Sequence, residues 1–187
     1  PVGWPYAESS EVHVLAALGS ESALLATLQE EDKVIDGKDV QGNTPLHIAL
    51  MTSHQNIAFV LLDALCKRGQ QAEERRDSGL ISSGPTRSSG IQFVDLDLKN
   101  QEGDTALDIA VTMKADAVIT RLIDLGASLQ CLGQPHLLVR HAISSKDTTL
   151  LAKLIAGNIS LAGAVYFAVL NGSSNEIVLE LLKANGD

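Results

Sequence analysis

A short stretch of sequence occurs twice in the chain, and this recurrence constrains the fold more than any single residue does. "DVQGNTPLHIAL" spans residues 39–50, and "NQEGDTALDIAV" spans residues 100–111. A second apolar stretch follows each copy, at 56–65 and at 116–128. Copies of one short unit are expected to stack side by side, because a single unit cannot bury its apolar face alone.

The first copy carries the signals of a helix start. Thr44 can cap a helix with its hydroxyl, and Pro45 then takes the first helical position. The missing N–H of proline costs nothing there, because that donor would have no partner within the helix. Leu46 and Ala49, three residues apart, share one face, and Ala49 is small enough to let another helix approach. The chain is 45% hydrophobic but only 3% aromatic, and a core of Leu, Ile, Val and Ala suits stacked helices better than a β-sandwich.

These features resemble the ankyrin repeat, a helix pair of about 33 residues with a T-P-L-H-x-A signature. "GNTPLHIA" at 42–49 carries the whole phrase, and "RLIDLGAS" at 121–128 is similar to the end of the family's second helix. The resemblance implies an all-α solenoid with short extended turns between its repeats. It also implies that His47 is a structural residue, which hydrogen-bonds locally and ties successive loops together, and that His54 starts a second helix.

Fainter copies follow from the small residue of each first helix. Taken as a marker, this residue gives Ala16, Ala49, Ala110, Ala142 and Ala168, with spacings of 33, 61, 32 and 26. The spacing of 61 fits one period plus an insert of about 28 residues, and the spacing of 26 implies a shortened turn. We therefore expect one domain over 1–187 with about five stacked helix pairs. The expected repeats lie near 6–38, 39–69 plus 94–99, 100–132, 133–159 and 160–187.

Residues 70–93 break the pattern and are expected to form a flexible insert within the second repeat. They are rich in Ser, Gly and charged residues and have no apolar period, so they cannot bury enough apolar surface to offset the entropy of ordering. The alternative is a regulatory or partner-binding segment, since residues 75–78 ("RRDS") are similar to a basophilic kinase target. We favour the unstructured loop.

The chain shows no motif of a catalytic or cofactor site. It has neither a glycine-rich phosphate loop nor a Gly-x-Ser-x-Gly nucleophile elbow. Cys131, His136 and His141 give a C-x₄-H-x₄-H spacing, but a zinc site usually needs four ligands and no second cysteine is near. Asp108 replaces His47 in the other copy, which argues against a required catalytic or metal-binding histidine. We therefore expect no enzyme activity within this chain, no catalytic residues, no metal and no cofactor.

Charge and cysteine content limit the partners and the compartment. Fourteen basic and twenty-three acidic residues give a formal charge of −9, which repels phosphate backbones and predicts no nucleic-acid partner. The two cysteines make no disulfide framework, and no apolar run approaches the ~20 residues of a membrane span. We expect a cytoplasmic monomer without membrane contact, or a protein of the host cytoplasm or nucleus if the parent is a secreted effector. The start at Pro1 without Met predicts a fragment of something longer.

The expected function is binding of a partner protein. In the family, the binding surface is the concave side, formed by the first helices and the extended turns. The exposed positions carried over onto this sequence are Lys38, Val40, Gln41, Asn43 and Met51 in one copy and Lys99, Gln101, Glu102, Asp104 and Met113 in the other. Met51 and Met113 come from matching first-helix ends and suit adaptable contacts, or they merely fill space between repeats.

The favoured hypothesis is therefore a non-catalytic protein–protein interaction module, or scaffold, with its partner in the concave groove. The alternative is a regulatory or substrate-targeting arm of a larger multidomain enzyme or bacterial effector. In that case the catalytic domain lies outside this chain.

Overall fold

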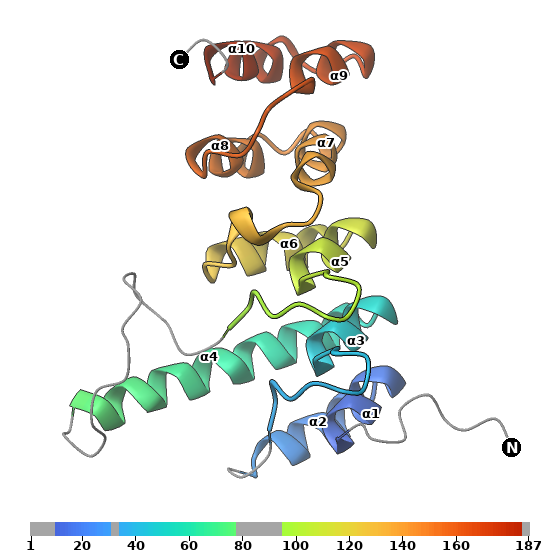
Figure 1. The fold of residues 1–187 in the computed structure, drawn as a ribbon, viewed down its shortest axis with the longest axis vertical. Coiled ribbons are helices and arrows are strands. Elements are labelled where there is room, and N and C mark those ends of the chain that lie inside the picture. Colours follow the sequence, from blue (N-terminus) through green and yellow to red (C-terminus); the bar gives the residue numbers. More distant parts are fainter. Residues whose placement is uncertain (1–9, 31–33, 78–94, 185–187) are drawn as a thin grey trace, which may run out of the picture.

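Five helix pairs follow one another along the chain and stack along the long axis of the molecule (Figure 1). The computed structural model describes residues 10–30, 34–77 and 95–184, with only the helical backbone described for 71–77. Within these ranges the regular structure is entirely helical, and the expected all-α ankyrin-type solenoid is confirmed. The pairs are α1 (Glu11–Leu18) with α2 (Glu21–Leu28), α3 (Pro45–Met51) with α4 (Gln55–Asp77), α5 (Ala106–Thr112) with α6 (Asp116–Asp124), α7 (Pro135–Ser145) with α8 (Thr148–Ala156), and α9 (Ala164–Leu170) with α10 (Asn175–Ala184); the short 3₁₀ turn η1 (Leu129–Cys131) precedes α7.

The repeated phrase starts α3 and α5 with the same reciprocal cap. The Thr44 hydroxyl accepts from the His47 backbone N–H, while the Thr44 N–H donates to His47 Nδ1 at 3.2 Å. Thr105 and Asp108 form the same box, with the Thr105 N–H donating to Asp108 Oδ2 at 3.0 Å. Pro45 occupies the first turn of α3. The predicted cap and proline position are therefore confirmed, and two backbone donors at each helix start are satisfied.

The first helix of every pair ends at a residue in the left-handed conformation. This residue shows which positions are equivalent from one pair to the next. These residues are Gly19, Ser53, Lys114, Lys146 and Gly172. The residue after each donates its N–H to a carbonyl in the last turns of the first helix, as in a Schellman ending. The accepting carbonyls belong to Leu15, Ala49, Ala110, Ala142 and Ala168.

This bond corrects the marker of the first pair. The residue equivalent to Ala49 is Leu15, not Ala16, because Gly19 ends α1 one residue earlier than the marker spacing implies. The marker in α3, α5, α7 and α9 is a fully buried alanine. Within the described residues no helix pair precedes α1, so a half-buried leucine fits at this position.

The prediction of a flexible insert from residue 70 is wrong for its first part, because α4 continues as a helix to Asp77. α6 and α8 stop where Gly126 and Asn158 take φ values of +89° and +58°. The aligned residue of α4 is Leu65, whose side chain is buried and whose Cβ disfavours the left-handed conformation.

The residues beyond Leu65 also favour a longer helix. Residues 70–76 read "QQAEERR" and consist of strong helix formers. Polar composition alone therefore did not distinguish a solvated helix from a loop. The rest of the predicted insert, 78–93, lies outside the described residues.

A continuous apolar core runs through the stack. Every pair contributes fully buried aliphatic side chains, such as Leu24, Ile57, Leu107, Leu138 and Leu181. Each first helix contacts the next first helix, and the first helices lie closer to one another than the second helices do. Burial of one such leucine contributes about 1.5–3 kcal/mol, so stacking is the main source of stability. None of the helices in the described ranges has the length and apolarity needed to span a bilayer.

Candidate protein-binding surface

Two extended turns project in front of α3 and α5, and we call them finger 1 (38–43) and finger 2 (99–104). Each finger closes on itself through backbone bonds, with the Asp39 N–H donating to the Asn43 carbonyl at 2.9 Å and the Asn100 N–H to the Asp104 carbonyl at 3.0 Å. One side-chain oxygen organises each tip. Asp39 Oδ1 accepts two backbone N–H groups of finger 1, and Asn100 Oδ1 accepts two of finger 2.

The two fingers are joined to one another by four hydrogen bonds. The Gln101 backbone N–H donates to the Gln41 carbonyl at 2.9 Å, and the Gln101 side-chain amide donates to the Val40 carbonyl at 2.7 Å. Lys38 Nζ donates to the Lys99 carbonyl at 2.8 Å. The fourth bond joins two side chains, from Asn100 Nδ2 to Asn43 Oδ1 at 3.2 Å.

Gly42 allows this close approach of the fingers. Its φ is +77°, and a Cβ at this position would lie 3.1 Å from the Gln101 nitrogen. Gly103 has a φ of +86° with open space around it. Both glycines serve the turn, but only Gly42 is also needed for contact with the neighbouring finger.

In each of the first three helix pairs, a further hydrogen bond joins the first helix to the turn that follows the pair. His13 Nε2 lies 3.0 Å from the Asn43 carbonyl oxygen, and His47 Nε2 lies 3.3 Å from that of Asp104. In the third pair, Asp108 Oδ1 accepts the Gly133 N–H at 3.1 Å. Histidine donates and aspartate accepts, yet both residues tie a helix start to the next turn.

His13 has the same role as His47 but was not predicted from the sequence. The Ser10 hydroxyl lies 2.7 Å from His13 Nδ1, as the Thr44 hydroxyl does from His47 Nδ1. The signal was present as a Ser-x-x-His spacing that parallels Thr-x-x-His. The rest of the signature phrase is absent from the first pair, so this spacing alone does not indicate the role of His13.

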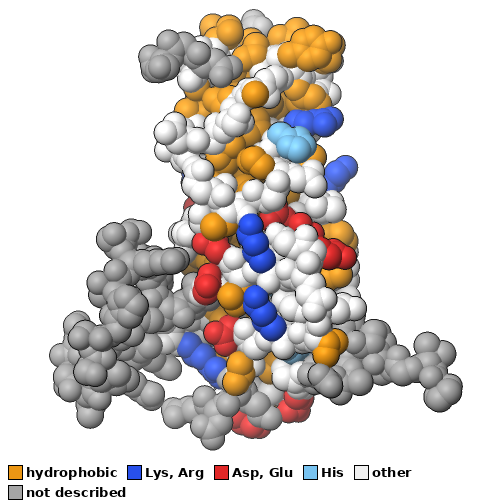
Figure 2. All heavy atoms as spheres, in the orientation of Figure 1, with side chains coloured by type: hydrophobic (Ala, Val, Ile, Leu, Met, Phe, Trp, Pro, Cys, Tyr) orange, Lys and Arg blue, Asp and Glu red, His pale blue; other side chains and the backbone are white. Residues whose placement is uncertain are grey.

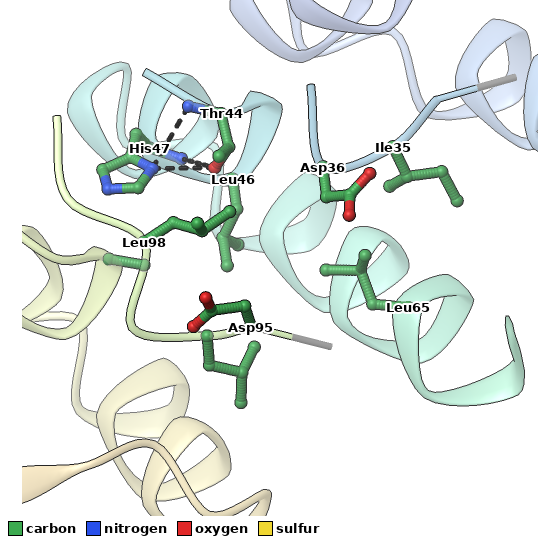
Figure 3. Close-up of a pocket in the computed structure, with 10 residues that line it drawn as sticks. Ile35, Asp36, Thr44, Leu46, His47, Leu65, Asp95 and Leu98 are labelled. Atoms are coloured by element: carbon green, nitrogen blue, oxygen red, sulfur yellow. Dashed lines mark hydrogen bonds between the residues drawn. The ribbon is translucent and has the colours of Figure 1, made fainter. Parts of the chain in front are cut away.

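His47 is a neutral structural residue. Its side chain is almost fully buried, and this burial lowers its pKa below the ordinary value, although the hydrogen bond to the Asp104 backbone acts in the opposite direction. Nδ1 accepts the Thr44 N–H (Figure 3), so Nε2 carries the proton and donates to the Asp104 carbonyl. The prediction that His47 ties successive loops together is confirmed.

A small cavity lies beside His47, between the turn that precedes α3 and the turn at 95–98 (Figure 3). Its volume is about 10 Å³, which is room for about one water molecule and not for a substrate. Its lining is mostly aliphatic, with Leu46, Leu65, Leu96 and Leu98 among the contributors. The aliphatic part of this lining supports packing between repeats.

Most of the predicted contact residues are at the surface. The side chains of Lys38, Val40, Gln41, Met51, Lys99, Gln101, Glu102 and Met113 are exposed, and Asp104 is half-buried. Asn43 is a correction, because it is only 2% exposed. Its amide lies within reach of Asp39 and Gln41 inside finger 1, so it shapes the turn and cannot meet a partner.

Met51 and Met113 do not occupy matching positions, contrary to the prediction. Met51 is the last residue of α3 and lies two residues after Ala49. Met113 follows the last residue of α5 and lies three residues after Ala110. Their side chains are nevertheless both exposed at the ends of neighbouring first helices.

The sequence-spaced Cys131, His136 and His141 lie on two different elements. Cys131 ends η1, and both histidines lie on α7. His141 Nε2 is 2.9 Å from Asp116 Oδ1 of the preceding pair. Among the residues whose placement is described, no three His, Cys, Asp or Glu side chains come together as a metal site would require.

Comparisons with known proteins agree with this architecture. The family described as "Ankyrin repeat" matches residues 41–68. The B-cell lymphoma 3 protein homolog of Mus musculus is 27% identical, over 78% of this chain and 36% of its own length. This chain therefore spans about a third of that relative.

Two solved structures share the fold. One is the Bd0816 predatory endopeptidase from Bdellovibrio bacteriovorus in complex with immunity protein Bd3460; a chain of it matches with 24% identity and a TM-score of 0.59, over 96% of this chain and 83% of that one. The other is the human ASB11 ankyrin repeat domain, with 18% identity and a TM-score of 0.54, over 93% of this chain and 68% of that one.

The signature in finger 1 and α3, the stacked pairs and these matches lead to one assignment. Residues 41–68 match the ankyrin-repeat family, and the chain as a whole has the ankyrin-type solenoid fold.

Proposed function

We propose that the chain is a non-catalytic module that binds a partner protein on the surface formed by the two fingers and the adjoining ends of α3 and α5. Ankyrin repeats are in general protein–protein interaction modules. The observation that carries the proposal is the construction of the fingers. Their backbones are fixed by bonds within and between turns, while their tip side chains stay exposed.

Such a surface is preorganised for binding. Rigid turns lose little conformational entropy when a partner docks, so more of the contact free energy is available as affinity. The closer approach of the first helices than of the second helices curves the stack toward the fingers. The partner would therefore lie in a shallow hollow lined by fingers and first-helix ends.

The proposed contacts divide into an apolar centre and a polar rim. Val40, Met51 and Met113 are exposed apolar side chains of 40–48% exposure on neighbouring elements. Methionine adapts its shape to an irregular partner surface. Gln41, Lys99, Glu102 and Asp104 supply the polar rim, and Lys38 and Gln101 contribute mainly by holding the fingers together.

The test compares two sets of exposed apolar residues in the full chain. The first variant changes Val40, Met51 and Met113 to Asp. The matched control changes Leu18 and Leu25 to Asp; these leucines are 58% and 45% exposed and lie on the first pair. Both are used as bait beside the wild-type chain, after circular dichroism has shown equal folding.

A protein captured by the wild type and by the control, but lost with the finger variant, is the expected result. Equal capture by both variants would contradict the assignment of the binding surface. A partner that is lost only with the Leu18 and Leu25 variant would move the site to the first helix pair.

A second proposal is a regulatory or targeting arm of a larger protein. It is favoured by the length of the mouse relative, of which this chain spans 36%. Under this proposal, the three-residue finger variant abolishes recruitment of a substrate but leaves a catalytic activity on a small generic substrate unchanged. Loss of both activities together would speak against a separate targeting role.

A further inference from the structure

Within the described residues, the last helix pair exposes apolar side chains at positions that contact the following pair in the earlier pairs. We define the onward face of a pair as the side directed at the pair that follows it, and in the last pair its residues are Tyr166, Val169 and Leu182. Figure 2 shows hydrophobic side chains gathered at this C-terminal end, while the acidic side chains in view lie over the earlier pairs. A repeat whose outer side meets solvent is expected to be polar there.

The position one residue after the marker gives the clearest comparison. In the first four pairs it is occupied by Ala16, Leu50, Val111 and Ile143, all of which are at most 8% exposed. In the fifth pair it is Val169, which is 60% exposed. Val169 is aliphatic like its equivalents, but no described helix pair covers it.

The position two residues before the marker also contacts the following pair in every pair except the last. His13, His47 and Asp108 each bond to the turn that precedes the next pair. Arg140 lies over the ring of Phe167 in the next pair, with Cζ 4.5 Å from the ring centroid. Every pair but the last therefore uses this position to hold its successor, and in the last pair it is Tyr166, 71% exposed.

The second helix of the last pair repeats this pattern. Leu181 is fully buried, like Leu61 and Leu122 in the earlier second helices. The next residue is fully buried in α4 (Leu62) and half-buried in α6 and α8 (Ile123 and Ile155), whereas in α10 it is Leu182, which is 51% exposed. α9 has the sequence "AVYFAVL" and carries no charge.

We propose that the onward face of the fifth pair binds a sixth ankyrin-type helix pair of the same polypeptide, stacked as the fifth is on the fourth. The choice of occupant rests on continuity with the four interfaces in the structure, where the consecutive pair of the same chain lies against the first helix and the position equivalent to Val169 is buried. Val169 and Leu182 would pack on its helices. Tyr166 would reach the turn before it, as His13 and His47 do.

The test joins a designed ankyrin helix pair with an aliphatic inner face, in register, to the C-terminal end of the full 187-residue chain. Hydrogen exchange of α9 and α10 is then compared with that of the unfused chain. We expect exchange to slow by about tenfold or more, because stacked neighbours stabilise a repeat. Two controls carry the specificity: the same fusion with Val169→Lys, and a fusion whose inner face is polar.

Each outcome either supports or overturns the proposal. Slower exchange that is lost in both controls supports the proposal, and Leu182→Lys gives a second variant if Val169→Lys fails to fold. Unchanged exchange, or equal slowing by the polar pair, overturns it. A concentration-dependent dimer of the unfused chain in velocity sedimentation, abolished by Val169→Lys, would assign the face to a second copy and also overturn it.

Discussion

The junction between the second and third helix pairs and the junction between the fourth and fifth are built differently. At the first, two fingers share four hydrogen bonds, and His47 adds a fifth to the Asp104 carbonyl. At the second, the described contacts are apolar packing, the stacking of Arg140 on Phe167 and a single hydrogen bond between turns, from Gln130 Nε2 to the Gly157 carbonyl. The fifth pair also starts without a side-chain cap, at Gly163.

The difference shows which part of the fold depends on the signature phrase. Apolar periodicity alone is enough to stack a helix pair, as α9 and α10 demonstrate. The polar residues of the phrase add rigid fingers, and these hold the exposed side chains of the proposed binding surface in place. The centre of the stack should therefore be both its most stable part and its functional part.

Truncation of a central core residue should have the largest effect. Leu107→Ala removes a fully buried side chain of α5 and should lower the free energy of unfolding by about 2–5 kcal/mol through the cavity it leaves. The matched change Leu182→Ala, at a half-exposed leucine of α10, should cost about 0.5 kcal/mol or less. Urea unfolding of both variants measures the difference, and equal costs would show that the register is wrong.

The glycines of the fingers give the next largest effect. Gly103→Ala should cost about 1–2 kcal/mol, since alanine is strained at positive φ. Gly42→Ala has the same strain, and its Cβ also meets the Gln101 backbone, so it should cost about 1 kcal/mol more. The difference between the two variants in thermal or urea unfolding measures how much stability depends on the close approach of the fingers. A larger loss of stability for Gly103→Ala than for Gly42→Ala would contradict the role assigned to Gly42.

The acid sensitivity of the centre should depend on His47. Its pKa is lowered in the folded chain, so the unfolded chain takes up the proton first as the pH falls. Stability should therefore be lost as the pH drops through the ordinary histidine pKa toward the lowered one, and further acidification should add nothing from this residue. His47→Gln should lose less stability over that window. Parallel pH profiles for the two proteins would contradict the role assigned to burial.

Gln101→Ala should have the smallest effect. Its amide donates to the Val40 carbonyl at 2.7 Å, but the side chain is exposed and water can replace the bond, so the cost should be about 0.5 kcal/mol or less. Gln130→Ala, which removes a bond to the Gly157 carbonyl at the later junction, is the matched comparison. A cost above that of Gly103→Ala would mean that finger contact depends on this side chain.

Much of the fold was predictable because its determinants are local. The caps at Thr44 and Thr105 and the apolar faces of α3 to α6 depend on residues close in sequence, and periodicity extended the stack to the weaker pairs. The end of α4 was not predictable from composition, since it depends on whether Leu65 or a residue tolerant of positive φ occupies one position.

The surface was predictable only in part, because exposure is a property of the assembled turns. Asn43 and Gln41 are both polar residues of finger 1, yet bonds within and between the fingers bury the first and leave the second exposed. The role of Tyr166 and Val169 could not be predicted either. It emerges only when equivalent positions are compared along the stack.

Hydrogen exchange along the unmodified chain tests most directly the claim that the signature-bearing centre is the most stable part of the stack. The account predicts the slowest amide exchange in α3, α5 and α6 and the fastest in α9 and α10, because the central pairs have covered neighbours on both sides and bonded fingers. Uniform protection along the stack, or slower exchange in α9 and α10 than in α3 and α5, would contradict it.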